Sequence, residues 1–256
     1  MARRRSESGT GKPLTVNNFL LVFREFFTAW LNSVLYYNKV YDQLTFDEVK
    51  AFDILLYKSR NPHLDKYIND LVLNIINNMI INKSRPNSLQ SVSCLVYDTR
   101  TDMVMKSYSL VFSQFVTNLS EAIHELREDL EGDTSALLDL PHAPWQEIYA
   151  QFQTSLFKHI QELRQETTTS DQTATSSSSS SSSSNTATEN DLFFKITVQL
   201  DSRIYPTNEG WVRLNEGNTL EESDARAFTL KPVCQLDLDL LCFEVVNKYH
   251  TNSELF

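Results

Sequence analysis

The chain has 256 residues, of which 41% are hydrophobic, and its formal net charge is −10. The hydrophobic fraction is enough for a substantial core and excludes wholesale disorder. Proteins that bind nucleic acid directly present a basic face to the phosphates, so the acidic balance argues against direct nucleic-acid binding.

The first fifteen residues, "MARRRSESGTGKPLT", form a basic and polar tail that we expect to be disordered. No apolar run follows the arginines, so the tail is not a secretory signal. Its arginine run is at most a weak nuclear-import patch. No run in the chain reaches the ~18 apolar residues that a membrane span needs. The odd number of cysteines, 3, favours a reducing compartment over a disulfide framework.

Helical periodicity predicts two helices in the first third of the chain. The stretch "VNNFLLVFREFFTAWLNSVLYYNKVY", residues 16–41, is apolar over most of its circumference, which is typical of a helix buried at the centre of a domain. A second helix is expected to begin at Pro62, a residue that suits the first turn, and to end near "NKSRPNS".

The middle of the chain is predicted to contain a β-hairpin followed by two helices. "SVSCLVYD" and "MVMKSYSLVF", joined by "DTRTD", predict a β-hairpin. A short acidic helix is expected over Leu119–Leu130, because Asn118 and Glu121 have the spacing of a capping box. A third long helix is predicted to start near Pro144 and to run through "WQEIYAQFQTSLFKHIQEL".

Residues 166–190 are mostly Thr, Ser, Gln and Asn without an apolar pattern, and they include a run of serines at 176–184, so we predict a flexible loop there. The sequence after this loop has β character, in "LFFKITVQLD", "WVRLNEG" and "QLDLDLLCFEV". The last stretch, Gln235–Val245, is interpreted as one strand whose leucines alternate with polar residues. Together the elements predict an α+β domain with helices packed on a largely antiparallel sheet.

Catalytic and metal motifs are weak in this sequence. "GTGKPLT" lacks the full phosphate-loop pattern, the histidines lack His-Glu-x-x-His spacing, and no Cys-x-x-Cys pair occurs, which disfavours a zinc site. Cys234 and Cys242, eight residues apart, are interpreted as inert thiols on one side of the predicted strand. The enzymatic alternative is a small cysteine hydrolase that uses Cys94 or Cys242 with His63.

Several stretches, taken in their order and spacing, resemble the HORMA-domain family, and within it the yeast-like accessory subunit of translesion DNA polymerase zeta. They are "LNSVLYYNKVY", "NPHLDKYINDLVLNII", "VSCLVYDTRTDMVMKSYSLVF", "FQTSLFKHIQEL", "GWVRLNE" and "TLKPVCQLDLDLLCFEV". The spacing of Pro62, Leu64, Tyr67 and Ile68 is the most specific part of this resemblance.

The resemblance implies a single HORMA domain over residues 16–256. Residues 16–165 would be its core, 166–190 the flexible loop, and 191–256 a safety-belt region that wraps a partner peptide. In such a domain the peptide is held as an added strand. By resemblance, Tyr67 lines the peptide channel, Trp211 covers the bound segment, and Leu241 and Phe243 lie near a surface for a second partner. Gln153 stands where family members often carry an arginine that supports self-association.

The resemblance also implies a function. We expect a non-catalytic nuclear adaptor without cofactors, which clasps a proline-containing segment of the catalytic subunit of DNA polymerase zeta. It would bridge that subunit to a scaffold polymerase, a deoxycytidyl transferase, during bypass of damaged DNA, and a second copy of the chain could join the assembly. The alternative within the same fold is a spindle-checkpoint-type adaptor that clasps a mitotic regulator.

Overall fold

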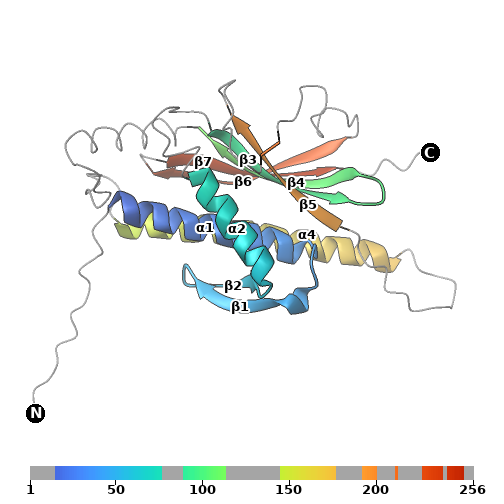
Figure 1. Ribbon diagram of the computed structural model, residues 1–256. Coiled ribbons are helices and arrows are strands. Elements are labelled where there is room, and N and C mark those ends of the chain that lie inside the picture. Colours follow the sequence, from blue (N-terminus) through green and yellow to red (C-terminus); the bar gives the residue numbers. More distant parts are fainter. Residues whose placement is uncertain are drawn as a thin grey trace, which may run out of the picture.

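The computed structural model describes residues 15–76, 89–113, 145–176, 192–200, 211–212, 227–238 and 241–250. The helices α1 (Val16–Tyr37), α2 (Pro62–Ile75) and α4 (Trp145–Ser176) lie against one face of a five-stranded sheet, and a small two-stranded hairpin lies on the other side of the helices (Figure 1). All strand pairs are antiparallel. The predicted α+β class, with three main helices on an antiparallel sheet, is therefore confirmed.

Helix α1 is the central helix, as its wide apolar face predicts. The Thr15 hydroxyl caps its start by accepting a hydrogen bond from the Asn18 N–H at 3.1 Å. The helix ends at Tyr37, four residues before the predicted end. Two residues later, Lys39 has a φ of 54°, a left-handed value that is incompatible with a right-handed helix. Its fully buried large side chains form the middle of the core: Phe19, Phe23, Phe26, Phe27, Trp30, Leu31 and Leu35.

Helix α2 begins where the sequence predicts. Pro62 occupies its first turn, and the Asn61 side chain accepts a hydrogen bond from the His63 N–H at 3.0 Å. The predicted end of this helix near "NKSRPNS" and the predicted acidic helix over 119–130 lie outside the described residues.

A short hairpin that the sequence analysis did not predict joins α1 to α2. It consists of β1 (Phe46–Ala51) and β2 (Ile54–Ser59), preceded by the 3-10 turn η1 (Gln43–Thr45). The turn residues Phe52 and Asp53 both have positive φ, 49° and 55°, as a two-residue turn of this kind requires. Neither is the Gly or Asn that usually signals such a turn.

The main sheet has the strand order β5-β3-β4-β7-β6. The predicted hairpin is confirmed as β3 (Leu89–Asp98) and β4 (Met103–Phe112). Strand β5 (Leu192–Leu200) pairs with β3 at one edge of the sheet, while β7 (Leu241–His250) pairs with β4 and carries β6 (Phe228–Leu238) to the opposite edge.

The structure corrects the interpretation of Gln235–Val245 as one strand. Strand β6 ends at Leu238 and β7 begins at Leu241, and the pair forms an antiparallel hairpin with Leu238 opposite Leu241. Leu236 lies opposite Phe243 on the core side, whereas Cys242 lies opposite Asp237 and therefore faces the other way. Cys234 and Cys242 are consequently not on one side of one strand.

Helix α4 continues to Ser176, ten residues beyond the predicted start of the flexible loop at 166. The Thr167 hydroxyl, whose Oγ1 lies 2.9 Å from the Leu163 carbonyl oxygen and 3.1 Å from that of Tyr37, ties this extension to α1. The remainder of the predicted loop, residues 177–190, lies outside the described residues.

Candidate functional site: an open edge of the sheet

The two edges of the five-stranded sheet differ in their ability to accept another strand. At the β6 edge, Pro232 has no backbone N–H and the pairing register shifts between Pro232 and Cys234, which are features that blunt an edge. Strand β5 contains no proline, and within the described residues no strand pairs with its outer side. Its unpaired N–H and C=O groups therefore make the β5 edge the better template for an added strand.

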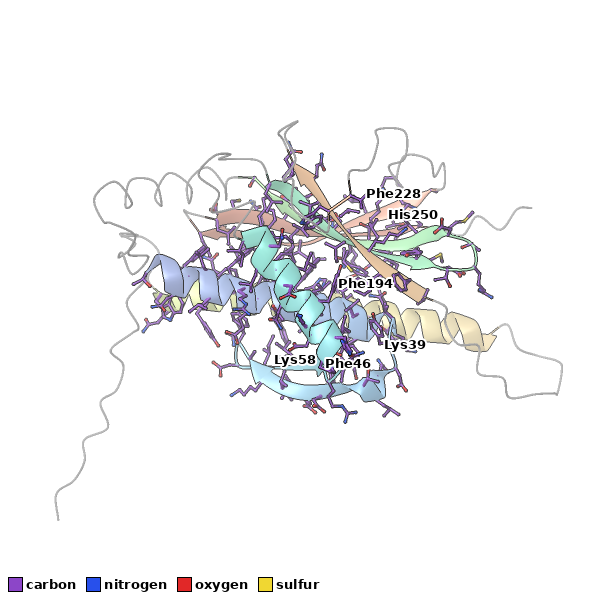
Figure 2. All side chains as sticks on the ribbon, viewed as in Figure 1. Lys39, Phe46, Lys58, Phe194, Phe228 and His250 are labelled. Carbon is purple, nitrogen blue, oxygen red and sulfur yellow. The ribbon has the colours of Figure 1, made fainter. Side chains whose placement is uncertain are left out.

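The inner face of β5 is apolar and incompletely covered. Phe194 is buried, and it points from β5 toward the helices, where its ring centroid lies 6.0 Å from that of Tyr67 and 6.3 Å from that of Tyr41 (Figure 2). Other side chains on this face are only partly buried although they pack against the core: Leu192, Ile196, Val198 and Leu200. An added strand could cover this row with apolar side chains of its own.

Helix α2 provides one wall beside this edge. Tyr67, Leu71 and Asn74 lie at helical spacings of four and three residues and so share one face of the helix. Tyr67 is 46% exposed although its ring contacts Phe194 edge-on. Burial, with smaller contributions from the nearby Cys94 and Tyr41 side chains, raises the pKa of Tyr67, so its hydroxyl is a neutral donor at physiological pH.

Trp211 lies beside the same wall. Its indole Nε1–H donates a hydrogen bond to Asn74 Oδ1 at 2.9 Å, and its ring packs against the core while remaining partly exposed. Tyr67 and Asn74 are about two helical turns apart on α2, roughly 10 Å along the axis. The structure thus brings the two residues predicted to contact a peptide, Tyr67 and Trp211, to one face of α2 next to β5; their contact with a peptide stays a prediction.

The connection between β5 and β6 joins the two edges of the sheet. Strand β5 ends with Leu200 at one edge of the sheet, and β6 begins with Phe228 at the opposite edge. Residues 201–227 must therefore travel from one edge to the other, and Trp211 within them is fixed to α2. This connection belongs to the region, residues 191–256, that the resemblance implies to be a safety belt; that it wraps a bound segment stays a prediction.

The structure corrects the expectation that Leu241 and Phe243 offer a surface to a second partner. Both side chains are 0% exposed. The Phe243 ring packs 5.5 Å from that of Phe26 and 5.7 Å from that of Phe112, centroid to centroid, so its place is in the core. Any partner on this hairpin would instead meet its exposed side chains, which include Gln235, Asp237 and Glu244.

Gln153, predicted to lie at a self-association surface, contacts another part of its own chain. Its Nε2 donates a hydrogen bond to the Phe52 carbonyl oxygen at 2.8 Å, which holds the turn of the β1–β2 hairpin against α4. Phe157, one turn further along α4, is 46% exposed. Self-association through this helix stays a prediction.

The thiols are poorly placed for nucleophilic catalysis. Cys94 is fully buried, and burial raises the pKa of its thiol, whereas a reactive cysteine needs a lowered pKa and access to substrate. Cys242 is buried, while His63 is exposed at the start of α2. These positions argue against the cysteine-hydrolase alternative.

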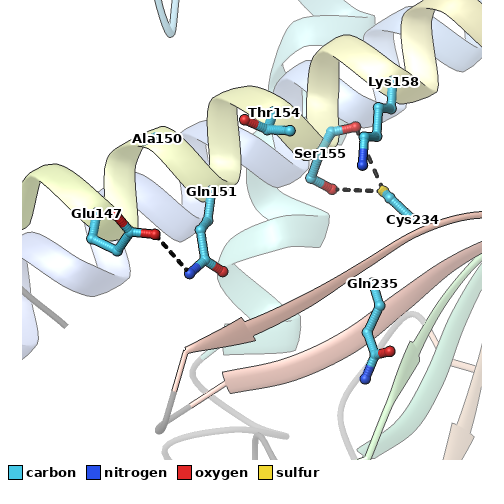
Figure 3. A pocket seen from close by; sticks show the side chains of 8 residues that line it. All are labelled: Glu147, Ala150, Gln151, Thr154, Ser155, Lys158, Cys234 and Gln235. Carbon is cyan, nitrogen blue, oxygen red and sulfur yellow. Dashed lines mark hydrogen bonds between the residues drawn. The ribbon is translucent and has the colours of Figure 1, made fainter. Parts of the chain in front are cut away.

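A shallow groove of about 280 Å³ lies between α4 and β6 (Figure 3). It contains Cys234, whose Sγ lies 3.1 Å from the Ser155 hydroxyl, and Glu147, which accepts a hydrogen bond from Gln151 at 3.2 Å. Burial raises the pKa of the Cys234 thiol. The thiol in this groove is hydrogen-bonded to Ser155, and no histidine that could activate it is among the lining residues.

Among the described residues, no group of three or more His, Cys, Asp or Glu side chains could hold a metal ion. None of the described helices is long and apolar enough to cross a membrane.

Comparisons with known proteins identify the fold. No family model matches the chain, and no curated protein matches it either. Solved structures do match. A chain of "Crystal Structure of Mitotic Checkpoint Complex" aligns at 12% identity with a TM-score of 0.53, over 91% of this chain and 99% of that one.

Two further matches are structures of peptide complexes. C. elegans HTP-1 bound to the HIM-3 closure motif aligns at 10% identity and a TM-score of 0.55, over 93% of each chain. HTP-2 bound to HTP-3 motif-6 aligns at 8% identity and a TM-score of 0.55, over 97% of this chain and 98% of that one. These neighbours are HORMA-domain proteins, so the similarity shows a HORMA fold. At such identities it establishes the fold and not the function.

Proposed function

We propose that this protein is a non-catalytic adaptor that clasps an extended segment of a partner protein along the open edge of β5. The observation that carries the proposal is the proline-free edge of β5, with which no described strand pairs on its outer side, together with Tyr67 and Trp211 beside it at α2. Two of the matching structures are bound to a short motif, described for one of them as a closure motif, and this supports the same mode of binding here.

The mode of binding follows from the physics of a sheet edge. The nine residues of β5 span roughly 30 Å, so backbone hydrogen bonds to them could supply affinity without regard to sequence. The alternating faces of β5 would supply selectivity. Side chains of the partner that point inward would meet Tyr67, Ile196 and Val198, and those that point outward would meet the exposed face of the sheet.

For the identity of the partner, we propose the catalytic subunit of translesion DNA polymerase zeta, within an assembly that also contains the scaffold deoxycytidyl-transferase polymerase and acts in the nucleus during bypass of damaged DNA. This finer assignment is supported by the sequence resemblance, and above all by the spacing of Pro62, Leu64, Tyr67 and Ile68. Because Leu241 and Phe243 are buried, the second partner would bind exposed residues of the β6–β7 hairpin instead.

A second candidate is an adaptor of the spindle-checkpoint type that clasps a mitotic regulator. The observation that favours it is the match to a chain of a mitotic checkpoint complex, which covers 99% of that chain. The same fold and the same open edge would serve either partner.

Affinity purification of the full chain from its native cell, followed by identification of the co-purifying proteins, distinguishes the two candidates. The Tyr67→Ala variant, purified in parallel, controls for proteins that do not use the β5 edge. Recovery of a polymerase catalytic subunit that depends on Tyr67 supports the polymerase assignment, and recovery of a mitotic regulator supports the second candidate. If no protein is lost from the Tyr67→Ala sample, the clasping proposal itself is wrong.

A further inference from the structure

The outer face of β5 carries a small patch that contains one exposed cation. Phe193 is 51% exposed, and its ring centroid lies 5.7 Å from that of Tyr97 on β3. Lys195, two residues further along β5, is exposed, and its Nζ lies 4.6 Å from the centroid of the Tyr97 ring. Phe193 and Lys195 point to the same side because side chains two apart in a strand share a face.

Lys195 has no anionic partner within the described part of the chain. Its one described interaction is the contact with the Tyr97 ring, although the chain as a whole carries a net charge of −10. Some lysines elsewhere in the fold do have a described anionic partner: Lys58 on β2 pairs with Asp65 at 2.9 Å, and Lys231 on β6 pairs with Glu162 at 2.6 Å. A cation without a described anionic partner, on the edge strand best suited to accept another strand, suggests that the counter-charge comes from the partner.

The register of an added strand fixes where this counter-charge would be. Whether the strand runs parallel or antiparallel to β5, the residues beside Phe193 and Lys195 on the outer face are two positions apart. The partner residue between them points inward, toward Phe194 and Tyr67. Along the edge, three successive residues of the partner would therefore meet Phe193 on the outer face, Phe194 and Tyr67 on the inner face, and Lys195 on the outer face.

We propose that Phe193 and Lys195 determine the specificity of this edge. They would select a partner segment with an acidic residue beside Lys195, an apolar residue two positions away beside Phe193, and an apolar residue between the two. This inference rests on the proposed clasping function and adds the chemical class of the segment.

The strength of the selection follows from the exposure of the pair. An exposed cation–π contact is weak, so Lys195 can leave the Tyr97 ring for a carboxylate on the adjacent strand. Opposite charges on directly adjacent strand positions strengthen pairing modestly, and like charges weaken it. We therefore expect an acidic residue to improve affinity about two- to fivefold over a neutral one, with a smaller effect at high salt.

A peptide selection on the full chain tests the proposal. Random peptides are selected on the wild-type chain and, in parallel, on Lys195→Glu and on the control Lys158→Glu. Lys158 is exposed on α4, beside the opposite edge of the sheet, so the control makes the same change in total charge away from β5. The affinities of the selected peptides are then measured with acidic, neutral and basic residues at the position that shows enrichment.

We expect acidic residues to be enriched by the wild-type chain and by Lys158→Glu, and basic residues to be enriched by Lys195→Glu. A Phe193→Ser variant should lose the preference for an apolar residue two positions away from the charged one. Peptides that bind with Tyr67-dependent affinity but show no charge preference, or the same preference on Lys195→Glu, would overturn this inference and leave the clasping function intact. If no peptide binds with an affinity that depends on Tyr67, the clasping function and this inference both fail.

Discussion

Tyr67 is the side chain on which the proposed site depends most, because it is half exposed and lies beside the open edge of β5. We predict that Tyr67→Ala weakens binding of a selected peptide by more than ~1 kcal/mol, about fivefold or more, as aromatic residues at interfaces often do. Calorimetry with the purified chain measures the effect. Tyr67→Phe should retain most of the affinity if the ring supplies the contact; an unchanged affinity for Tyr67→Ala would remove Tyr67 from the site.

His159 makes a different kind of contribution, because it is 0% exposed in the core. Its ring lies 6.0 Å from that of Trp30 and 6.1 Å from that of Tyr108, centroid to centroid, and neither of its ring nitrogens has a hydrogen-bond partner within the described residues. Burial lowers the pKa of His159 to about 3. The folded protein therefore keeps this imidazole neutral at pH values where the unfolded chain protonates it.

This shift predicts a pH dependence of stability. Because the folded pKa lies below the unfolded value of about 6.5, the unfolded state binds more protons, and stability falls as the pH drops below about 6.5. His159 alone should lower the free energy of unfolding by about 2 kcal/mol between pH 6.5 and pH 5. Urea unfolding at both pH values should show a smaller loss for His159→Leu than for the wild-type chain; equal losses would contradict the assignment.

At the level of secondary-structure elements, the β6–β7 hairpin is fixed to α4 by a charged contact. Lys231 on β6 lies 2.6 Å from Glu162 on α4, whose side chain is 9% exposed, and Tyr249 on β7 donates a hydrogen bond to the same carboxylate at 3.4 Å. Burial, with smaller contributions from the Glu166 and Glu162 carboxylates, raises the pKa of Tyr249 against the opposing effect of its hydrogen bond with Asn247, and this keeps the hydroxyl protonated as a donor.

Glu162→Ala should therefore destabilise the fold by about 1–2 kcal/mol, more than an exposed ion pair contributes but less than a fully buried one. The matched control is Lys50→Ala, which breaks the Lys50–Asp53 pair, whose side chains are both 67% exposed. This control should stay within about 0.5 kcal/mol of the wild-type chain. The double variant Glu162→Ala/Lys231→Ala should lose less stability than the two single variants lose in sum. Additive losses would show that the two side chains are not energetically coupled.

The elements also show where sequence patterns sufficed and where they did not. Periodicity located α1, α2, and the β3–β4 hairpin because long amphipathic patterns leave few alternatives. It failed at the β6–β7 turn, since the leucine alternation continues through Leu240 while the strand pairing reverses the chain at that point. The β1–β2 hairpin was missed because its turn, Phe52 and Asp53, lacks a glycine or asparagine.

The site itself was only partly accessible from sequence. Tyr67 and Trp211 entered through resemblance to a family, and no local pattern marks either residue. The burial of Leu241 and Phe243 could not be predicted while the two residues were interpreted as part of a longer strand. Lys195 carries no sequence signal at all, because its significance depends on the Tyr97 ring on the adjacent strand and on the outer side of β5, where no described strand pairs.

At the scale of the whole molecule, the net charge of −10 disfavours direct binding of nucleic acid. The isolated protein should show negligible DNA binding at physiological salt, since it has too few basic groups to displace counterions from phosphate. Fluorescence anisotropy with a labelled duplex measures this. Tight, sequence-independent binding by the pure chain would mean that contact with DNA does not require partner proteins.

The passage of residues 201–227 from the β5 edge to the β6 edge has a consequence for the lifetime of a complex. In the clasping mode proposed above, a segment added to β5 would be held by the covalent chain between β5 and β6 as well as by its own contacts. If both flanks of the segment are folded domains, it cannot slide out lengthwise, and release requires Trp211 to leave Asn74 or the β6–β7 hairpin to detach. The dwell time would then be set by the opening of the adaptor, so that even a partner with modest contacts could remain bound through many cycles of work.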